Sequence, residues 1–118
     1  MSDNNLRIDY IEFPAIDLAK TKAFYQRVFN WKFTDYGPDY SSFEDGRIAG
    51  GFRSDDEATE PTHEGVLVVI FADALEATLK AVADAGGVIV KPIFEFPGGR
   101  RFHFTDPSGN ELAVWSDK

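Results

Sequence analysis

Glu12 and His103 are the side chains best suited to chemistry. Glu12 follows Tyr10 by two positions in an alternating segment, so on a strand both side chains point to the same face. There the Glu12 carboxylate could serve as a general base or bind a cationic ligand, or it could simply pair with an arginine or backbone group at a subunit contact. His103 stands between Phe102 and Phe104, where an imidazole could face a ligand or pack as a structural residue. We therefore treat both as candidate catalytic residues, each with a structural alternative.

Other residues could hold a ligand. Arg100 and Arg101 follow a Gly98-Gly99 turn, so two guanidinium groups could clamp a carboxylate or phosphate, or else decorate an exposed hairpin tip. His63 lies in a polar segment, where a solvated histidine is expected more often than a metal ligand. Asp106 opens an Asp-Pro-Ser-Gly sequence that favours a turn-capping role. Aromatic side chains that could line a pocket for a flat ligand are Tyr10, Phe52, Phe102 and Trp115.

Composition narrows the classes of partner. The 118 residues include 20 acidic and 12 basic side chains, and the net charge of -8 argues against nucleic acid or an anionic membrane as partner. The absence of cysteine excludes disulfides, thiolate metal sites and cysteine nucleophiles. No apolar run is long enough for a membrane span, and residues 1–7 lack a hydrophobic signal core. We therefore expect a soluble, cytoplasmic protein with one core, which 43% apolar residues can supply.

The elements that must position these residues occur in the same order twice. The first half predicts a helix that begins after Asp17 and stops at Asn30, and the second half predicts a helix capped by Asp73 and ended by Gly86-Gly87. Gly50-Gly51 suggests a bulge or a close backbone approach inside a strand. The predicted strands are 8–14, 31–36, 40–44 and 47–53 in the first half and 66–71, 88–95, 101–105 and 111–115 in the second.

Each half is thus β-α-β-β-β, an internal repeat that predicts one α+β domain over 1–118. The first module covers about 6–53, a polar linker about 54–64, and the second module about 65–118. Two tandem modules should form a curved sheet with the helices on its outer faces. The concave faces would then form a cup.

Two segments carry a family resemblance. Ile16-Asp17-Leu18 through Ala23-Phe24-Tyr25 to Phe29-Asn30-Trp31 is similar to the segment "D-x-x-K/R-A-x-x-F-Y-x-x-x-F-G-W", and residues 106–112 to the turn "D-P-x-G-N-x-x". On these motifs the chain resembles the glyoxalase, bleomycin-resistance and extradiol dioxygenase superfamily, the vicinal oxygen chelate proteins. The resemblance implies a homodimer, or a closely packed pair of modules, whose strands surround a small molecule. In the metal-dependent branches it further implies one divalent ion held by His, Gln or Glu.

This chain departs from that ligand set. The positions to compare hold Tyr10, Leu67 or Val66, Ala113, and residues near Ala49 to Gly51. Alkyl side chains supply no donor atom for a divalent metal. We therefore predict no metal ligands and no cofactor, while leaving open a metal held by an unorthodox set.

Three functions follow as expectations. The first is a bleomycin-resistance-like protein that binds a small organic ligand in an aromatic-lined cup without the usual metal. The second is an enzyme, either a glyoxalase-like lyase or a dioxygenase-like oxidoreductase, that uses Glu12 with His63 or His103. The third is a non-catalytic interaction subunit whose own side chains fill the cup. In each case we expect a homodimer that binds neither nucleic acid nor membranes.

Overall fold

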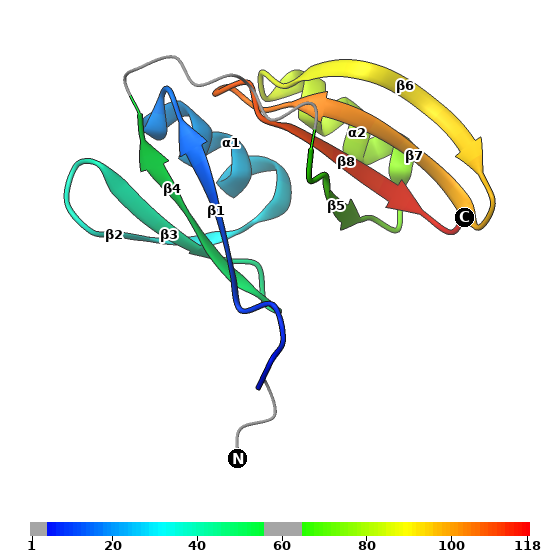
Figure 1. Cartoon of the computed structure of the whole chain (residues 1–118). Coiled ribbons are helices and arrows are strands. Elements are labelled where there is room, and N and C mark those ends of the chain that lie inside the picture. The colour runs from blue at the N-terminus through cyan, green and yellow to red at the C-terminus, as the bar shows by residue number, and fades with distance from the viewer. Residues whose placement is uncertain (1–4, 56–64) are drawn as a thin grey trace.

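The computed structural model describes residues 5–55 and 65–118, so His63 and most of the predicted linker lie outside the described residues. Within the described residues the chain forms two β-α-β-β-β modules, which confirms the predicted fold (Figure 1). The first contains β1 (Tyr10–Ala15), α1 (Leu18–Phe29), β2 (Lys32–Asp35), β3 (Tyr40–Glu44) and β4 (Ala49–Ser54). The second contains β5 (Val68–Phe71), α2 (Leu75–Asp84), β6 (Val88–Phe96), β7 (Gly99–Thr105) and β8 (Glu111–Ser116).

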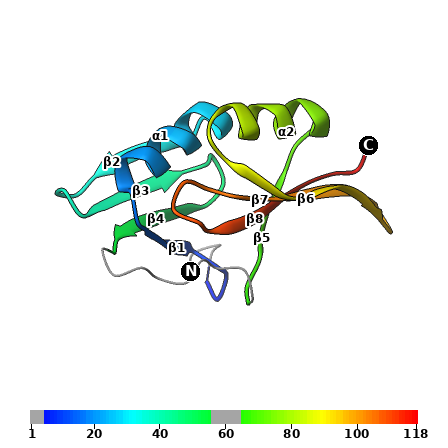
Figure 2. The same cartoon turned by 90° about the horizontal axis from the view of Figure 1, so that it is seen from above.

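Each module builds its own four-stranded sheet, in the order β1-β4-β3-β2 and β5-β8-β7-β6. The first strand of each module runs parallel to the last, and the other neighbours are antiparallel. Both helices lie on the same side of the two sheets (Figure 2). The opposite side of each sheet is called its helix-free face below. No helix in the described part of the chain is both long and apolar enough to cross a membrane.

Some predicted element ends were wrong. β1 begins at Tyr10 and β5 at Val68, two residues later than predicted, because Ile8 and Val66 lie exposed before the first ladder pairs. Asp73 does not cap α2: the N-cap position is Ala74, one residue later, and it makes no side-chain cap bond. Asp73 instead accepts a hydrogen bond from Lys118 Nζ at 3.2 Å.

The predicted ends of α1 are confirmed. Asp17 accepts a hydrogen bond from the backbone N–H of Lys20 at 3.0 Å, which satisfies one free donor of the first turn. Asn30 ends the helix with a left-handed φ of 58°. Between these ends, Phe24 and Tyr25 are buried against the sheets.

One hydrophobic core spans both modules. Phe104 of the second sheet packs against Phe24 and Phe29 of α1, with ring centroids 5.8 and 6.1 Å apart. Tyr25 of the same helix packs on Phe52 of the first sheet at 5.2 Å. Because α1 contacts both sheets, neither module buries its apolar surface alone.

The turn between β7 and β8, residues 106–110, fastens the second module to the first. Ser108 Oγ accepts hydrogen bonds from the backbone N–H groups of Ile16 at 2.9 Å and Asp17 at 3.3 Å. Asn110 Nδ2 donates to the carbonyl oxygen of Pro14 at 2.8 Å. The two motifs that carry the family resemblance therefore contact each other, and the polar residues Ser108 and Asn110 serve the fold.

Asp106 is the buried centre of that turn, as its turn-capping role predicts. Its carboxylate accepts from the backbone N–H groups of Ser108 and Asn110 and from Tyr25 Oη at 3.0 Å. Burial raises the pKa of Asp106, although the hydrogen bonds from Asn110, Tyr25 and Ser108 oppose that rise. Burial and then the nearby Asp106 charge raise the pKa of Tyr25 well above its ordinary value.

Candidate functional site

A polar network occupies the helix-free face of the first module. Tyr40 Oη donates to Glu12 Oε1 at 3.0 Å, and the hydroxyl groups of Tyr10 and Tyr40 are hydrogen-bonded to each other. Arg53 Nη1 lies 3.4 Å from Glu12 Oε2. Tyr10 is 42% exposed, and the side chains of Glu12 and Arg53 are 42% and 45% exposed. These four residues, called the tyrosine–glutamate network, confirm that Tyr10 and Glu12 share a face and leave their functional groups open to a ligand.

Glycine at position 51 makes room for this network. A Cβ there would lie 2.2 Å from Tyr40 Oη and 2.5 Å from Tyr10 Oη. Gly50, on the opposite face, would bring a Cβ 2.2 Å from the Phe43 ring. The strands on both sides of this pair keep a regular register, so the glycines mark a close approach and not a bulge. Burial, followed by the hydrogen bonds to Tyr10 and Glu12, raises the pKa of Tyr40.

The helix-free face of the second module carries a histidine–carboxylate pair. His103 Nδ1 lies 2.9 Å from Glu111 Oε2, so Nδ1–H donates to the carboxylate. His103 is only 3% exposed, and its buried Nε2 has no hydrogen-bond partner among the residues that the structure describes. Phe94 packs beside the imidazole, with ring centroids 5.8 Å apart. Ala113, the register partner of His103, is fully buried, so neighbouring side chains cover the face at these two positions.

The predicted arginine clamp is wrong, because Arg100 and Arg101 point to opposite faces of β7. Arg100 reaches the helix side and pairs with Glu76 of α2, with Nη2 3.2 Å from Oε1. Arg101 lies on the helix-free face, with its guanidinium carbon 5.3 and 5.6 Å from the ring centroids of Phe94 and Phe96. Successive residues of a strand alternate between faces, so adjacent arginines cannot grip one anion together.

Other predicted ligand contacts are also redistributed. Phe52 and Phe102 are fully buried in the helix-covered core, so their rings do not line an open pocket. Glu12 and His103 lie on different sheets, and the chain does not assemble them into one hydrogen-bonded site. Trp115 stands on the helix-free face of β8 and packs edge-on against Phe71 at 5.3 Å.

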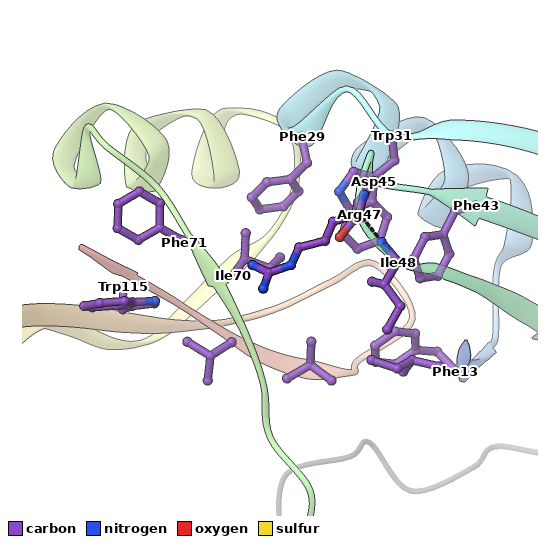
Figure 3. Close-up of a pocket in the computed structure, with 13 residues that line it drawn as sticks. Phe13, Phe29, Trp31, Phe43, Asp45, Arg47, Ile48, Ile70, Phe71 and Trp115 are labelled. Carbon is purple, nitrogen blue, oxygen red and sulfur yellow. Dashed lines mark hydrogen bonds between the residues drawn. The ribbon is translucent and has the colours of Figure 1, made fainter. Parts of the chain in front are cut away.

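A cleft of about 710 Å³ opens between the two modules (Figure 3). Its most prominent polar group is the guanidinium of Arg47, which extends into the cleft toward Ile70. Asp45 fixes the backbone from which this side chain extends, because its Oδ1 accepts from the backbone N–H of Arg47 at 2.8 Å and of Ile48 at 2.7 Å. Of the predicted ligand residues, only Trp115 lines the cleft. The wall is otherwise formed by Ile11, Phe13, Phe29, Trp31, Phe43, Ile48, Val68, Val69, Ile70 and Phe71.

The sequence as a whole fits a known family. Residues 7–114 match the Glyoxalase/Bleomycin resistance protein/Dioxygenase superfamily. The chain belongs to this superfamily. No curated protein sequence matches it.

Solved structures share the fold of this glyoxalase superfamily member. A glyoxalase/bleomycin resistance protein/dioxygenase family enzyme from Burkholderia phytofirmans PsJN superposes with a TM-score of 0.80 and 18% identity, over 94% of this chain and 100% of that chain. The fosfomycin resistance protein FosX from Listeria monocytogenes superposes with a TM-score of 0.77 and 20% identity, over 92% of this chain and 91% of that chain. Lactoylglutathione lyase from Agrobacterium tumefaciens superposes with a TM-score of 0.70 and 18% identity, over 94% of this chain and 93% of that chain. At these identities the likeness shows a common fold.

The metal set of the superfamily does not fit the residues present here. Its expected positions hold Tyr10, Leu67, residues 49–51 and Ala113, and the last is fully buried beneath its neighbours. No group of three or more His, Cys, Asp or Glu side chains gathers in the described ranges in a way that could hold a metal ion. A phenol and alkyl groups do not make the oxygen and nitrogen donor set that a divalent ion requires.

Several residues of the candidate site escaped the sequence reasoning. Glu111 could have been found, because the predicted turn at 106–109 pairs Thr105 with Glu111 and so brings Glu111 diagonally beside His103. Tyr40 and Arg53 required the register of β3 on β4, in which the two residues are direct partners. Arg47 gave no signal, because the cleft depends on how the two modules pack.

Proposed function

We propose that this chain binds a small organic molecule on the helix-free faces of its modules and does so without the metal centre of its superfamily. The tyrosine–glutamate network is the observation that carries the proposal. It gathers two phenols, a carboxylate and a guanidinium on an open face, outside the core that the fold needs. Such convergent polar groups beside aromatic rings are typical of ligand sites.

A thermal-shift screen of small organic molecules tests this proposal. We expect at least one compound to raise the melting temperature of the wild-type protein, because a ligand that binds only the folded state stabilises it. Glu12→Gln and Tyr40→Phe should abolish that shift, whereas Glu44→Gln, an exposed carboxylate at the end of β3, should preserve it. Shifts that survive both network variants would place the ligand elsewhere. Native mass spectrometry of the same sample should show no stoichiometric metal.

We further propose that the protein is a homodimer. β1 and β5 are the edge strands of their sheets, and each has a ladder partner on one side only among the described residues. Apolar side chains remain exposed on β5, with Val69 at 41% and Phe71 at 48%, and just ahead of β1, with Ile8 at 78%. An exposed apolar edge strand is a template for pairing with another chain.

Light scattering coupled to gel filtration tests the dimer. The wild type should elute with twice the monomer mass, and Phe71→Asp should shift it toward the monomer. Leu6→Asp, a control at an exposed apolar residue ahead of β1, should keep the wild-type mass. A monomeric wild type would refute this part of the proposal. A cytoplasmic location stays a prediction from composition.

An enzyme is the second candidate, and the His103–Glu111 pair favours it. A carboxylate that holds Nδ1–H orients the imidazole and leaves Nε2 free to move a proton. If a turnover is found, His103→Gln should abolish it while the protein stays folded by circular dichroism. Turnover that persists in this variant would remove His103 from the reaction.

A further inference from the structure

Two side chains of β7 each contain a buried polar atom that lacks a hydrogen-bond partner among the described residues. Within residues 5–55 and 65–118 these atoms are Arg101 Nε and His103 Nε2. Two positions apart on one strand, they belong to the same helix-free face. Buried polar groups are nearly always hydrogen-bonded, so a pair of exceptions on one face needs a physical reason.

Arg101 is held ready for an anion. Its guanidinium lies against the rings of Phe94 and Phe96, which fixes the side chain, and its buried Nε has no hydrogen-bond partner in the described ranges. No carboxylate of the described residues forms an ion pair with it, although acidic residues outnumber basic ones by 20 to 12 in the chain. Arg100, its neighbour on the strand, is fully engaged by Glu76. The missing counter-ion of Arg101 can therefore come from a ligand.

In its protonated, imidazolium form His103 supplies a second donor on the same face. Because Glu111 accepts from Nδ1–H, the imidazolium form presents Nε2–H away from Glu111. Lys91, the register partner of His103 on β6, adds a further positive charge beside it. β6 is an edge strand whose register shifts on both sides of Lys91, so the segment that carries Phe94 over His103 is the irregular part of the sheet.

We propose that Arg101 and His103 bind the carboxylate of a flat, aromatic organic acid, with the rings of Phe94 and Trp115 against its apolar body. Trp115 is the register partner of Arg101 on β8, so it stands beside the guanidinium. The inference deepens the proposed function and rests on it, because it assigns a ligand class and a binding residue to the second helix-free face. A carboxylate would accept from Arg101 Nε–H and from the Nε2–H of the imidazolium form of His103, and both buried groups would then be hydrogen-bonded.

Benzoate and its neutral isostere benzamide test this proposal by NMR titration of the full chain. Trp31 and Trp115 both line the cleft, but only Trp115 is a neighbour of Arg101, so a ligand at Arg101 should shift the indole N–H signal of Trp115 alone. We expect benzoate to shift the Trp115 signal saturably with little effect on Trp31. Benzamide should bind at least about tenfold more weakly than benzoate. Arg101→Gln should weaken benzoate by about tenfold, and His103→Gln by a few-fold. Arg100→Gln, on the other face of the same strand, should bind benzoate like the wild type.

Each alternative outcome has a distinct meaning. Equal binding of benzoate and benzamide, or benzoate binding unchanged in Arg101→Gln, would overturn the anion site while the proposed small-molecule function survived. A concerted shift of Trp31 and Trp115 would move the ligand into the cleft and overturn the site too. If neither probe binds and the compound screen also finds nothing, both proposals fall. A wild-type-like spectrum of each variant shows that lost binding does not reflect lost folding.

Discussion

The two modules have the same succession of elements, but their helix-free faces differ in exposure and in polar side chains. On the first, Tyr10 is 42% exposed, and its hydroxyl group is hydrogen-bonded to that of Tyr40, which is half-buried. On the second, His103 is 3% exposed and Ala113 is fully buried. Gly51 and Ala113 occupy equivalent places on the last strand of each module, opposite Glu12 and Val69. The same succession of elements thus supports one face with an exposed polar network and another that is buried around His103 and Ala113, where His103 Nε2 has no hydrogen-bond partner among the described residues.

This difference separates the functional alternatives. An interaction subunit whose side chains fill its own cup requires both faces to be closed, and the first is open. A metal enzyme of the superfamily type requires donors on both, and Ala113 provides none. The proposed binding protein needs an accessible face with polar groups, and the first module presents one.

Loss of Phe104 should have the largest effect, and it tests whether the modules are separate at all. Phe104 belongs to the second sheet but packs on α1 of the first module. We expect Phe104→Ala to reduce the free energy of unfolding by about 3–5 kcal/mol. Urea denaturation should still show one transition, whereas Phe94→Ala, at an exposed ring, should cost much less. Two transitions would mean that the modules unfold independently.

The aspartates that cap the two equivalent hairpin turns should respond unequally. In Asp106→Asn, an amide nitrogen replaces an oxygen that accepts from buried donors, so we expect a loss of about 1–3 kcal/mol. Asp45 is exposed, and an asparagine oxygen can still accept from both backbone N–H groups, so Asp45→Asn should cost less than about 0.5 kcal/mol. Urea denaturation of both variants checks the contrast.

The cost of Asp106→Asn should also depend on pH. Because the folded-state pKa of Asp106 is raised, the folded protein binds this proton more tightly than the unfolded chain. The contribution of Asp106 to wild-type stability therefore falls as pH rises from about 3.9, the ordinary carboxyl value, through the raised pKa. The asparagine variant lacks that fall, so the difference between the two proteins should be largest at acid pH and shrink toward neutral pH. A difference that grew with pH would contradict the raised pKa.

Particular residues show what the sequence could predict. The repeat, Asp17, Asn30 and the shared face of Tyr10 and Glu12 follow from local spacing, and all are observed. The prediction that Arg100 and Arg101 clamp one anion was wrong, although the alternation of side chains along a strand already argues against it. Phe52 and Phe102 were misplaced because spacing shows which residues share a face but does not show which face a helix covers. Arg47 and the cleft depend on packing between modules, which has no local signature.

Exchange of the small residues at the equivalent positions 51 and 113 tests the contrast between faces directly. Gly51→Ala would place a Cβ against the hydroxyl groups of Tyr10 and Tyr40, so we expect the pair to separate at a cost of about 1–2 kcal/mol. Ala113→Gly should cost about 0.5–1 kcal/mol, since glycine in a strand adds backbone freedom to the unfolded chain. Urea denaturation measures both losses. A neutral Gly51→Ala would show that the network tolerates displacement and is not built around that glycine.

The smallest expected effect is on the titration of Tyr40, and it probes how the open face holds a proton. Glu12 accepts the Tyr40 hydroxyl hydrogen, and its charge opposes formation of the phenolate, so Glu12→Gln should lower the pKa of Tyr40 toward about 10. The fall should be partial, because burial is the first cause of the raised pKa and remains in the variant. Phenolate absorbance, with Tyr40→Phe to assign the transition and Glu44→Gln as control, measures the change. Since the raised pKa makes the folded state lose stability as pH climbs above about 10, the variant should also lose less stability there. An unchanged titration would mean that Glu12 and Tyr40 are not coupled in solution, and the open face would then be a set of separate side chains with no network to recognise a ligand.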